Sequence, residues 1–313
     1  CFWITIIVII MWFLIVLIMC NRIRLAVSMV RIASIYIIRT CCIIIVPFVF
    51  LIIMLIWIVY WIFLSIFLYS TGEFDPKGSK VIASFKWDAK IRYCWWVHLF
   101  GLIFISAVIS AFADFLYASS ASIWYFTHER GLEPCPIRKS IYRGFRFHFG
   151  SITFGALIIA IARFIMFFFE QIKKRIELSY IKPTKSKCFR CVITCFQCIL
   201  SCITRLIEFL NKQAYIQIAI KGTSFCTAAW EGFALVIKNL GRFSTLYLIG
   251  NTFTFFGTII IAVCSGIIGF EIITNVKYFS EDLTSCILPV FCFVFIGLIM
   301  GLITMSVMGI SMD

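Results

Sequence analysis

The chain has 313 residues, of which 63% are hydrophobic and 13% are charged, and its mean hydropathy is +1.06. Soluble domains are about half apolar and a quarter charged, so this composition excludes a soluble protein and indicates a membrane protein. The net charge of +14 does not indicate nucleic-acid binding, because the basic residues cluster in short loops beside apolar runs, as in membrane proteins.

Six segments are apolar and long enough to cross a bilayer, whose core of about 30 Å needs roughly 20 helical residues. In chain order they are 1–19, 41–69, 94–126, 149–169, 244–270 and 287–312. The stretch 188–239 is apolar but interrupted by charges. It could hold one crossing with an interfacial helix, or two short or re-entrant pieces, and we place one crossing there. We therefore predict an all-α, polytopic transmembrane helix bundle with about seven crossings, forming one transmembrane domain over 1–313.

The charges of the connecting segments predict the orientation of these crossings. The segment 20–40 carries four arginines and no acid, so we place it in the cytoplasm. Alternation then makes 71–93 an extracellular loop and returns 127–147 to the inside. The segment 171–190 conflicts with this order, because it carries seven bases and one acid yet lies one crossing later. We expect 171–240 to be a Cys-rich region, on the cytoplasmic side or at the membrane interface, with one crossing.

Asp114 is the most informative single residue, because it is the only acid of its apolar span. A carboxylate inside a membrane costs a few kcal/mol, so it normally faces a cavity or a partner. Asp114 is therefore a candidate to hold a cationic substrate or to carry a proton. The structural alternative is an ion pair with Arg163 or with a lysine on another helix.

Aromatic residues and histidines provide the other candidates. Trp95, Trp96, Trp124 and Tyr125 lie at the two ends of one long span, where aromatic residues form interfacial belts but can also cage a quaternary ammonium. His98 and His148 could relay protons near neutral pH, or cap and bridge helices.

Five cysteines with alternating spacings of three and four residues form one stripe of a helix: Cys188, Cys191, Cys195, Cys198 and Cys202. A single helical stripe cannot close a tetrahedral metal site, so we expect no metal there. The pattern instead indicates S-palmitoylation or simple burial. The chain contains no phosphate-binding loop, nucleophile elbow, zinc-protease motif or dinucleotide fingerprint, so we predict neither an enzyme nor a cofactor.

Several blocks in order resemble the choline transporter-like family. They are Arg22–Ala26, Tyr60–Ile62, Ser70–Glu73, Trp95–Ser106, Arg146–Gly155, Phe209–Tyr215 and Ser224–Ala229. The resemblance covers nearly the whole chain. It implies a ten-helix transporter of choline, or of related cations such as ethanolamine, with proton exchange. We expect this chain to hold the last seven helices and to be truncated at both ends.

Relatives in this family carry Glu where this chain has Ala107, Gln where it has Asp114, and Glu where it has Thr204. Asp114 therefore either replaces the missing acid of its helix, roughly two turns away, or marks a different substrate or proton coupling. The implied function is alternating access around an aromatic-lined cavity, with Asp114 supplying the charge. We place the protein in the plasma membrane, with an organelle membrane as the alternative.

Two other function classes stay open. A non-transporting structural or assembly subunit would need only helix packing. The small residues Gly297 and Gly301, and Ala156 and Ala160, fit that role. A passive channel lacks support, because the chain has neither a ring of acids nor a filter-like run.

Overall fold

The computed structural model describes residues 24–25, 27–74, 85–86, 88–127, 136–179, 187–275 and 287–312. These residues are almost entirely helical, so the predicted all-α class is confirmed. The exception is a hairpin of two-residue strands, β1 (Glu73–Phe74) and β2 (Phe85–Lys86), which pair antiparallel within the 71–93 loop. The first predicted span, 1–19, lies outside the described residues.

Six helices of the described part are long and apolar enough to span a membrane. Over the described residues these helices cover Cys42–Ser70, Ala89–Phe126, Pro136–Arg175, Val192–Lys221, Leu240–Asn275 and Ile287–Met312, and each contains an apolar stretch of membrane-spanning length. Five of them contain the predicted spans that the structure describes. The fourth shows that the interrupted stretch holds one long helix, α6 (Lys187–Lys221), followed by a shorter one, α7 (Phe225–Lys238). Gly222 ends α6 with a φ of 71°, and its amide donates to the Ile218 carbonyl at 2.8 Å.

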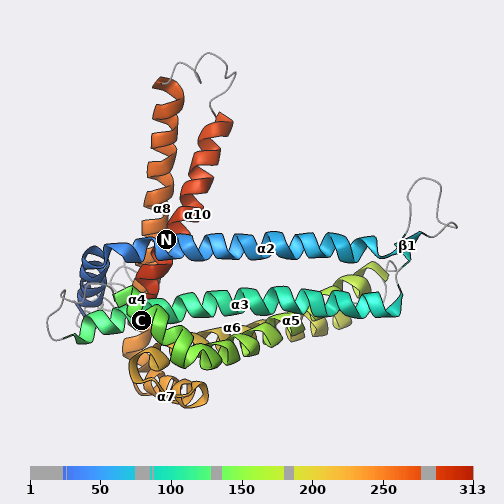
Figure 1. Ribbon diagram of the computed structural model, residues 1–313, viewed down its shortest axis with the longest axis horizontal. Coiled ribbons are helices and arrows are strands. Elements are labelled where there is room, and N and C mark those ends of the chain that lie inside the picture. Colours follow the sequence, from blue (N-terminus) through green and yellow to red (C-terminus); the bar gives the residue numbers. More distant parts are fainter. Residues whose placement is uncertain are drawn as a thin grey trace, which may run out of the picture. The chain divides into compact units, whose positions relative to one another are not determined.

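The described chain divides into two compact units. The first consists of the described residues within Cys1–Phe48, Tyr117–Lys139 and Ala234–Asp313. Its main feature is a hairpin of α8 (Leu240–Asn275) and α10 (Ile287–Met312), which lie side by side (Figure 1). A Cβ at Gly301 would lie 3.0 Å from the Thr258 carbonyl, and one at Gly297 would lie 3.1 Å from the Ala262 Cα. These two glycines therefore let the helix backbones approach closely, as the sequence predicts.

The second unit consists of Val49–Leu116 and Ser140–Phe233. It contains most of α2 (Val46–Ser70) and α3 (Ala89–Phe126), the end of α4 (Pro136–Arg143), α5 (Phe149–Ser179), α6 and most of α7. A π-helical turn, η2 (Gly144–His148), joins α4 to α5. Within this unit α2, α3, α5 and α6 run alongside one another (Figure 1). Ala156 and Ala160 of α5 are completely buried, which agrees with their predicted packing role.

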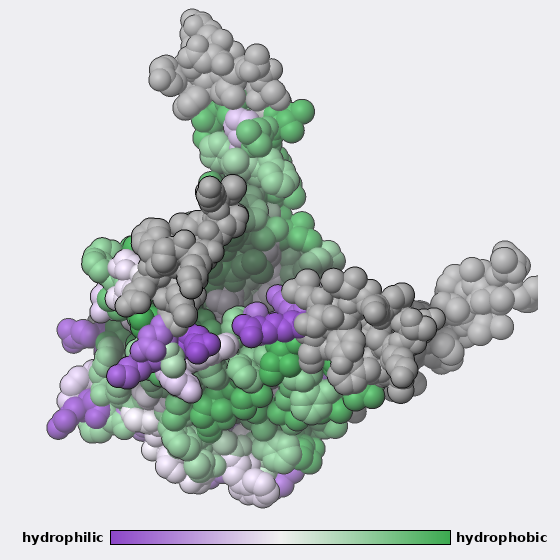
Figure 2. Space-filling model, turned by 90° about the vertical axis from the view of Figure 1, so that its right-hand side faces the viewer, coloured by the Kyte–Doolittle hydropathy of each residue, from purple (hydrophilic) through white to green (hydrophobic). Residues whose placement is uncertain are grey.

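The outer surface of these helices suits contact with lipid. The only buried residues of α2 are Val46 and Pro47, although the helix is strongly apolar. The face shown in Figure 2 is largely hydrophobic, and its hydrophilic residues gather in a few patches. In water such a surface would aggregate, so the structure supports a multi-pass membrane protein.

Candidate functional site

Asp114 lies on α3 and is half-buried. It is close enough to Tyr215 of α6 for its carboxylate to act electrostatically on the phenol. Tyr215 is only 1% exposed, and its hydroxyl donates a hydrogen bond of 3.4 Å to the Ile152 carbonyl of α5. The Asp114 carboxylate of α3 therefore lies near the place where Tyr215 of α6 packs on α5. Lys212 precedes Tyr215 by three residues, so it lies on the same side of α6.

Gly155 of α5 makes this packing possible. A Cβ at this position would lie 2.6 Å from the Tyr215 hydroxyl oxygen and 2.5 Å from the Phe225 ring. The Gly155 carbonyl also accepts a bond of 3.3 Å from the Asn211 side-chain amide, which is buried. The missing side chain thus allows Tyr215 to pack directly against α5.

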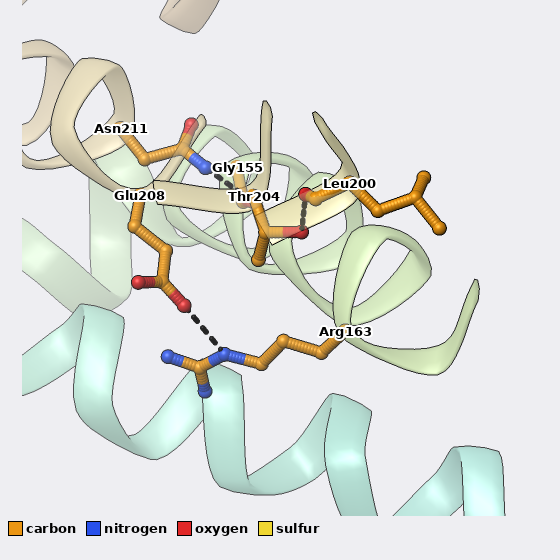
Figure 3. A network of polar contacts seen from close by, with 6 residues as sticks. All are labelled: Gly155, Arg163, Leu200, Thr204, Glu208 and Asn211. Carbon is orange, nitrogen blue, oxygen red and sulfur yellow. Dashed lines mark hydrogen bonds and ion pairs between the residues drawn. The ribbon is translucent and has the colours of Figure 1, made fainter. Parts of the chain in front are cut away.

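An ion pair joins α5 and α6 further along the same interface. Arg163 and Glu208 point toward one another, with 2.9 Å between Nε and Oε1 (Figure 3). The two side chains are 46% and 38% exposed, so they lie at the edge of the packed interface. Thr204, one turn before Glu208, donates to the Leu200 carbonyl at 2.9 Å. The partner that the structure shows for Arg163 is therefore Glu208, which the sequence analysis did not propose.

His148 lies close to the Asp114 region. It is the last residue of the π-helical turn, and its ring centroid is 5.7 Å from that of Phe115, the residue after Asp114. A Cβ at Gly222 would lie 3.6 Å from its Cε1 atom, so His148 also approaches the end of α6. Within this unit Asp114, Tyr215 and His148 therefore lie in one region, and π-helical turns are frequent at functional sites.

His98 bridges α2 and α3. Its ring stacks on Trp61 with centroids 4.8 Å apart, and its Nε2 atom lies 2.9 Å from the Ser65 hydroxyl. The Trp61 indole N–H donates to the His98 backbone carbonyl at 3.0 Å. These contacts match the bridging alternative of the sequence analysis.

Trp95 and Trp96 line a partly open cavity of about 390 Å³ between α3 and α5. The Trp96 ring contacts Phe168 edge-on at 5.4 Å. Trp95 precedes Asp114 by 19 residues on one helix, which corresponds to roughly 28 Å. These tryptophans and Asp114 therefore cannot contact the same small substrate.

Trp124 and Tyr125 belong to the first unit. Trp124 is buried against Tyr36, with ring centroids 5.5 Å apart, whereas Tyr125 is 45% exposed. The Tyr36 hydroxyl shares a hydrogen bond of 2.5 Å with Ser120. The Trp124 indole N–H and the Ser119 hydroxyl are buried without a hydrogen-bond partner among the described residues. This cluster could therefore still donate hydrogen bonds to a small polar molecule.

A polar stripe of α6 that faces α5 was not among the sites predicted from the sequence. Its members are Thr204, Glu208, Asn211 and Tyr215. Their spacings of four, three and four residues place them on one side of the helix. This periodicity was the signal in the sequence that could have identified the stripe. The charges of 188–239 were instead interpreted only as interruptions of an apolar stretch. Cys195, Cys198 and Cys202 lie on another side of α6 and are exposed, whereas the side chains of Cys188 and Cys191 lie outside the described residues.

A protein-family model described as plasma-membrane choline transporter matches residues 3–313. The chain belongs to this family. The resemblance found in the sequence is therefore confirmed over nearly its whole length. Since the family is one of transporters, the prediction that the chain is not an enzyme is confirmed at the level of the family.

Curated relatives from this family of choline transporters agree with the match. The chain is 29% identical over 282 residues to choline transporter-like protein 1 of Rattus norvegicus, covering 88% of this chain and 41% of the relative. It is 29% identical over 258 residues to choline transporter-like protein 2 of Dictyostelium discoideum, covering 82% and 39%. The chain thus spans about two fifths of the length of these relatives.

Proposed function

We propose that this chain forms the substrate-translocating helices of a membrane transporter for choline or a related small organic cation such as ethanolamine. The observation that carries this proposal is the position of Asp114, half-buried in a membrane span near the place where Tyr215 of α6 packs on α5. Family membership supports choline as the first substrate to test.

A carboxylate beside an aromatic ring matches what a small ammonium ion needs inside a membrane. Leaving water costs the cation its hydration, and a nearby negative charge offsets that loss. An aromatic face adds cation–π attraction of roughly 0.5–2 kcal/mol. In this proposal a substrate ammonium competes for Asp114 with Lys212, the cation on the same side of α6. The charge of Asp114 is then neutralised by Lys212 when the site is empty and by the substrate when the site is loaded.

Alternating access requires parts that move as units. Within the second unit α5 and α6 are joined along their length by the Arg163–Glu208 ion pair, the Asn211–Gly155 bond and a bond of 2.6 Å from Lys173 to Gln197. We propose that this pair of helices moves as one body against α3. This movement would open the site first toward one side of the membrane and then toward the other, and Asp114 would be exposed to each side in turn. His148, beside Phe115, is our candidate for a proton-exchange group.

Uptake of radiolabelled choline by the purified protein in vesicles tests this proposal. We expect uptake above that of empty vesicles, competition by excess ethanolamine, and a response to an imposed pH gradient. Uptake equal to that of empty vesicles would refute transport of choline. It would favour the second function below.

A structural or assembly subunit is the second candidate function. The glycine-mediated packing of α8 on α10 favours it, because such packing alone builds a stable membrane hairpin. In this case the protein would copurify with a partner and show no uptake alone. Measured uptake by the protein alone would exclude this function.

We also propose that the exposed cysteines of α6 are S-acylated, with an acyl-CoA as donor and the free thiol of coenzyme A as leaving group. Cys195, Cys198 and Cys202 are exposed, and the bond from Lys173 to Gln197 shows that this part of α6 lies at the level of the basic end of α5. Replacing all three by Ser should reduce hydroxylamine-sensitive labelling, and replacing Cys188 and Cys191 as well should abolish it. Replacing the exposed Cys264 of α8 by Ser should not reduce it.

A further inference from the structure

The cavity between α3 and α5 is built from two chemically different halves. One half is aromatic and carries Trp95, Trp96, Phe167 and Phe168. The other half is polar and carries Gln171 and Arg175, which lie one turn apart on the same side of α5. The volume of about 390 Å³ falls in the range of sites for small molecules, which is about 300–1,000 Å³.

The charge of the cavity excludes the substrate proposed above as its occupant. Among the described residues Arg175 is the only charged one that lines it, so a bare organic cation would be repelled there. The aromatic half, however, attracts a quaternary ammonium through cation–π contacts. A guanidinium binds phosphate through two parallel hydrogen bonds. A ligand that satisfies both halves carries a phosphate and a quaternary ammonium a few bonds apart.

The position of the cavity indicates where such a ligand comes from. The apolar run of α5 ends at Phe169, and the polar stretch Glu170–Arg175 follows it, which places Arg175 at the level of the lipid phosphates. Arg175 is exposed and forms no ion pair within the part of the chain that the structure describes, whereas Lys173 bonds Gln197. Apolar side chains that line the cavity are themselves exposed, among them Phe168 at 45% and Ile172 at 39%. Acyl chains can therefore lie against the helices below the headgroup.

From these observations we infer that the cavity binds the phosphocholine headgroup of a membrane phospholipid, with the ammonium against Trp95 and Trp96 and the phosphate on Arg175. This site lies roughly 28 Å along α3 from Asp114 and does not depend on the proposed transport. It gives the protein a preferred lipid at one end of the α3–α5 pair.

Photoactivatable phosphatidylcholine, incorporated into vesicles with the purified protein, tests this inference by mass-spectrometric mapping of the crosslinks. We expect crosslinks on α3 and α5 around the cavity. Excess phosphatidylcholine should compete with the label, and phosphatidylglycerol should compete about tenfold more weakly, because it lacks the ammonium. If phosphatidylglycerol competed as well as phosphatidylcholine, the assignment of the ammonium to the aromatic half of the site would be wrong. Equal competition by water-soluble phosphocholine would overturn the assignment to a lipid.

Variants separate this site from loss of folding. Arg175→Gln should reduce crosslinking about tenfold, whereas Lys174→Gln, which removes a neighbouring cation that does not line the cavity, should leave it unchanged. Arg175→Glu should lose phosphatidylcholine and gain binding of free choline, a change of preference that misfolding cannot produce. Unchanged crosslinking in Arg175→Gln would overturn the inference. Transport of choline is not part of the readout, so this inference and the proposed function can fail independently.

Discussion

Tyr215 packs where a side chain on Gly155 would otherwise lie. A Cβ on Gly155 would come within 2.6 Å of the Tyr215 hydroxyl and within 2.5 Å of the Phe225 ring. This relationship brings α6 against α5 at the level of Asp114. It makes the smallest residue of the interface one of the most sensitive to substitution.

Gly155→Ala should displace Tyr215, because neither the buried phenol nor the Phe225 ring has space to move away. We expect a loss of roughly 1–3 kcal/mol of stability, the usual effect of overpacking, together with reduced choline uptake. The matched control is Gly150→Ala on the same helix, where an added Cβ would meet nothing within 4 Å. Thermal unfolding in detergent measures both. Equal stability of the two variants would contradict the packing described here.

The Arg163–Glu208 ion pair should show energetic coupling. Removing one member leaves the other charge at a membrane-embedded helix surface, whereas removing both leaves none. Arg163→Gln and Glu208→Gln should therefore each destabilise the protein. The double variant should be more stable than the two separate effects predict, by about 1 kcal/mol or more. Denaturation of all four proteins completes the double-mutant cycle, and additive effects would show that the pair contributes nothing.

The α8–α10 hairpin should tolerate no side chain at Gly301. A Cβ there would lie 3.0–3.1 Å from the Thr258 backbone, which cannot move without shifting α8. Gly301→Val should lower the melting temperature, with a cost of roughly 1–3 kcal/mol. Gly309→Ala serves as the control, since its Cβ would make an ordinary contact of 3.8 Å with Thr254. Similar melting temperatures for both variants would refute the close helix approach.

Tyr36 should make the protein sensitive to alkaline pH. Burial raises its pKa to about 12, despite the hydrogen bond to Ser120, which lowers it. Between the unfolded pKa of about 10 and the folded pKa, only the unfolded state loses the proton, so stability falls as pH rises through this window. Below pH 10 the contribution is fully present. Tyr36→Phe should remove this part of the pH dependence in thermal unfolding at pH 8 and 11. An identical slope in both proteins would contradict the burial of the phenol.

The spans could be predicted from hydropathy because lipid allows few alternatives to an apolar helix. The interrupted stretch was harder, because Glu208 looks like a charge too costly for a membrane span until Arg163 is known to lie opposite it. Asp114 was recognisable as a charge in an apolar span. Its neighbour Tyr215 was not, since it is 101 positions away in the chain and only the packing of α6 brings it close. The separation of Trp95 and Trp96 from Asp114 follows from α3 being one unbroken helix, which composition alone does not establish.

The most direct test of the proposed function is the uptake of radiolabelled choline by Asp114→Asn, compared with Asp114→Glu and Glu271→Gln in matched vesicles. Glu271 is an exposed acid near the end of α8, where it accepts a bond from Asn275, so it controls for the loss of a carboxylate elsewhere. We predict that choline uptake falls at least about tenfold in Asp114→Asn. Asp114→Glu should retain part of the uptake, and Glu271→Gln should retain all of it. Full uptake by a correctly folded Asp114→Asn protein would contradict the central role of this carboxylate.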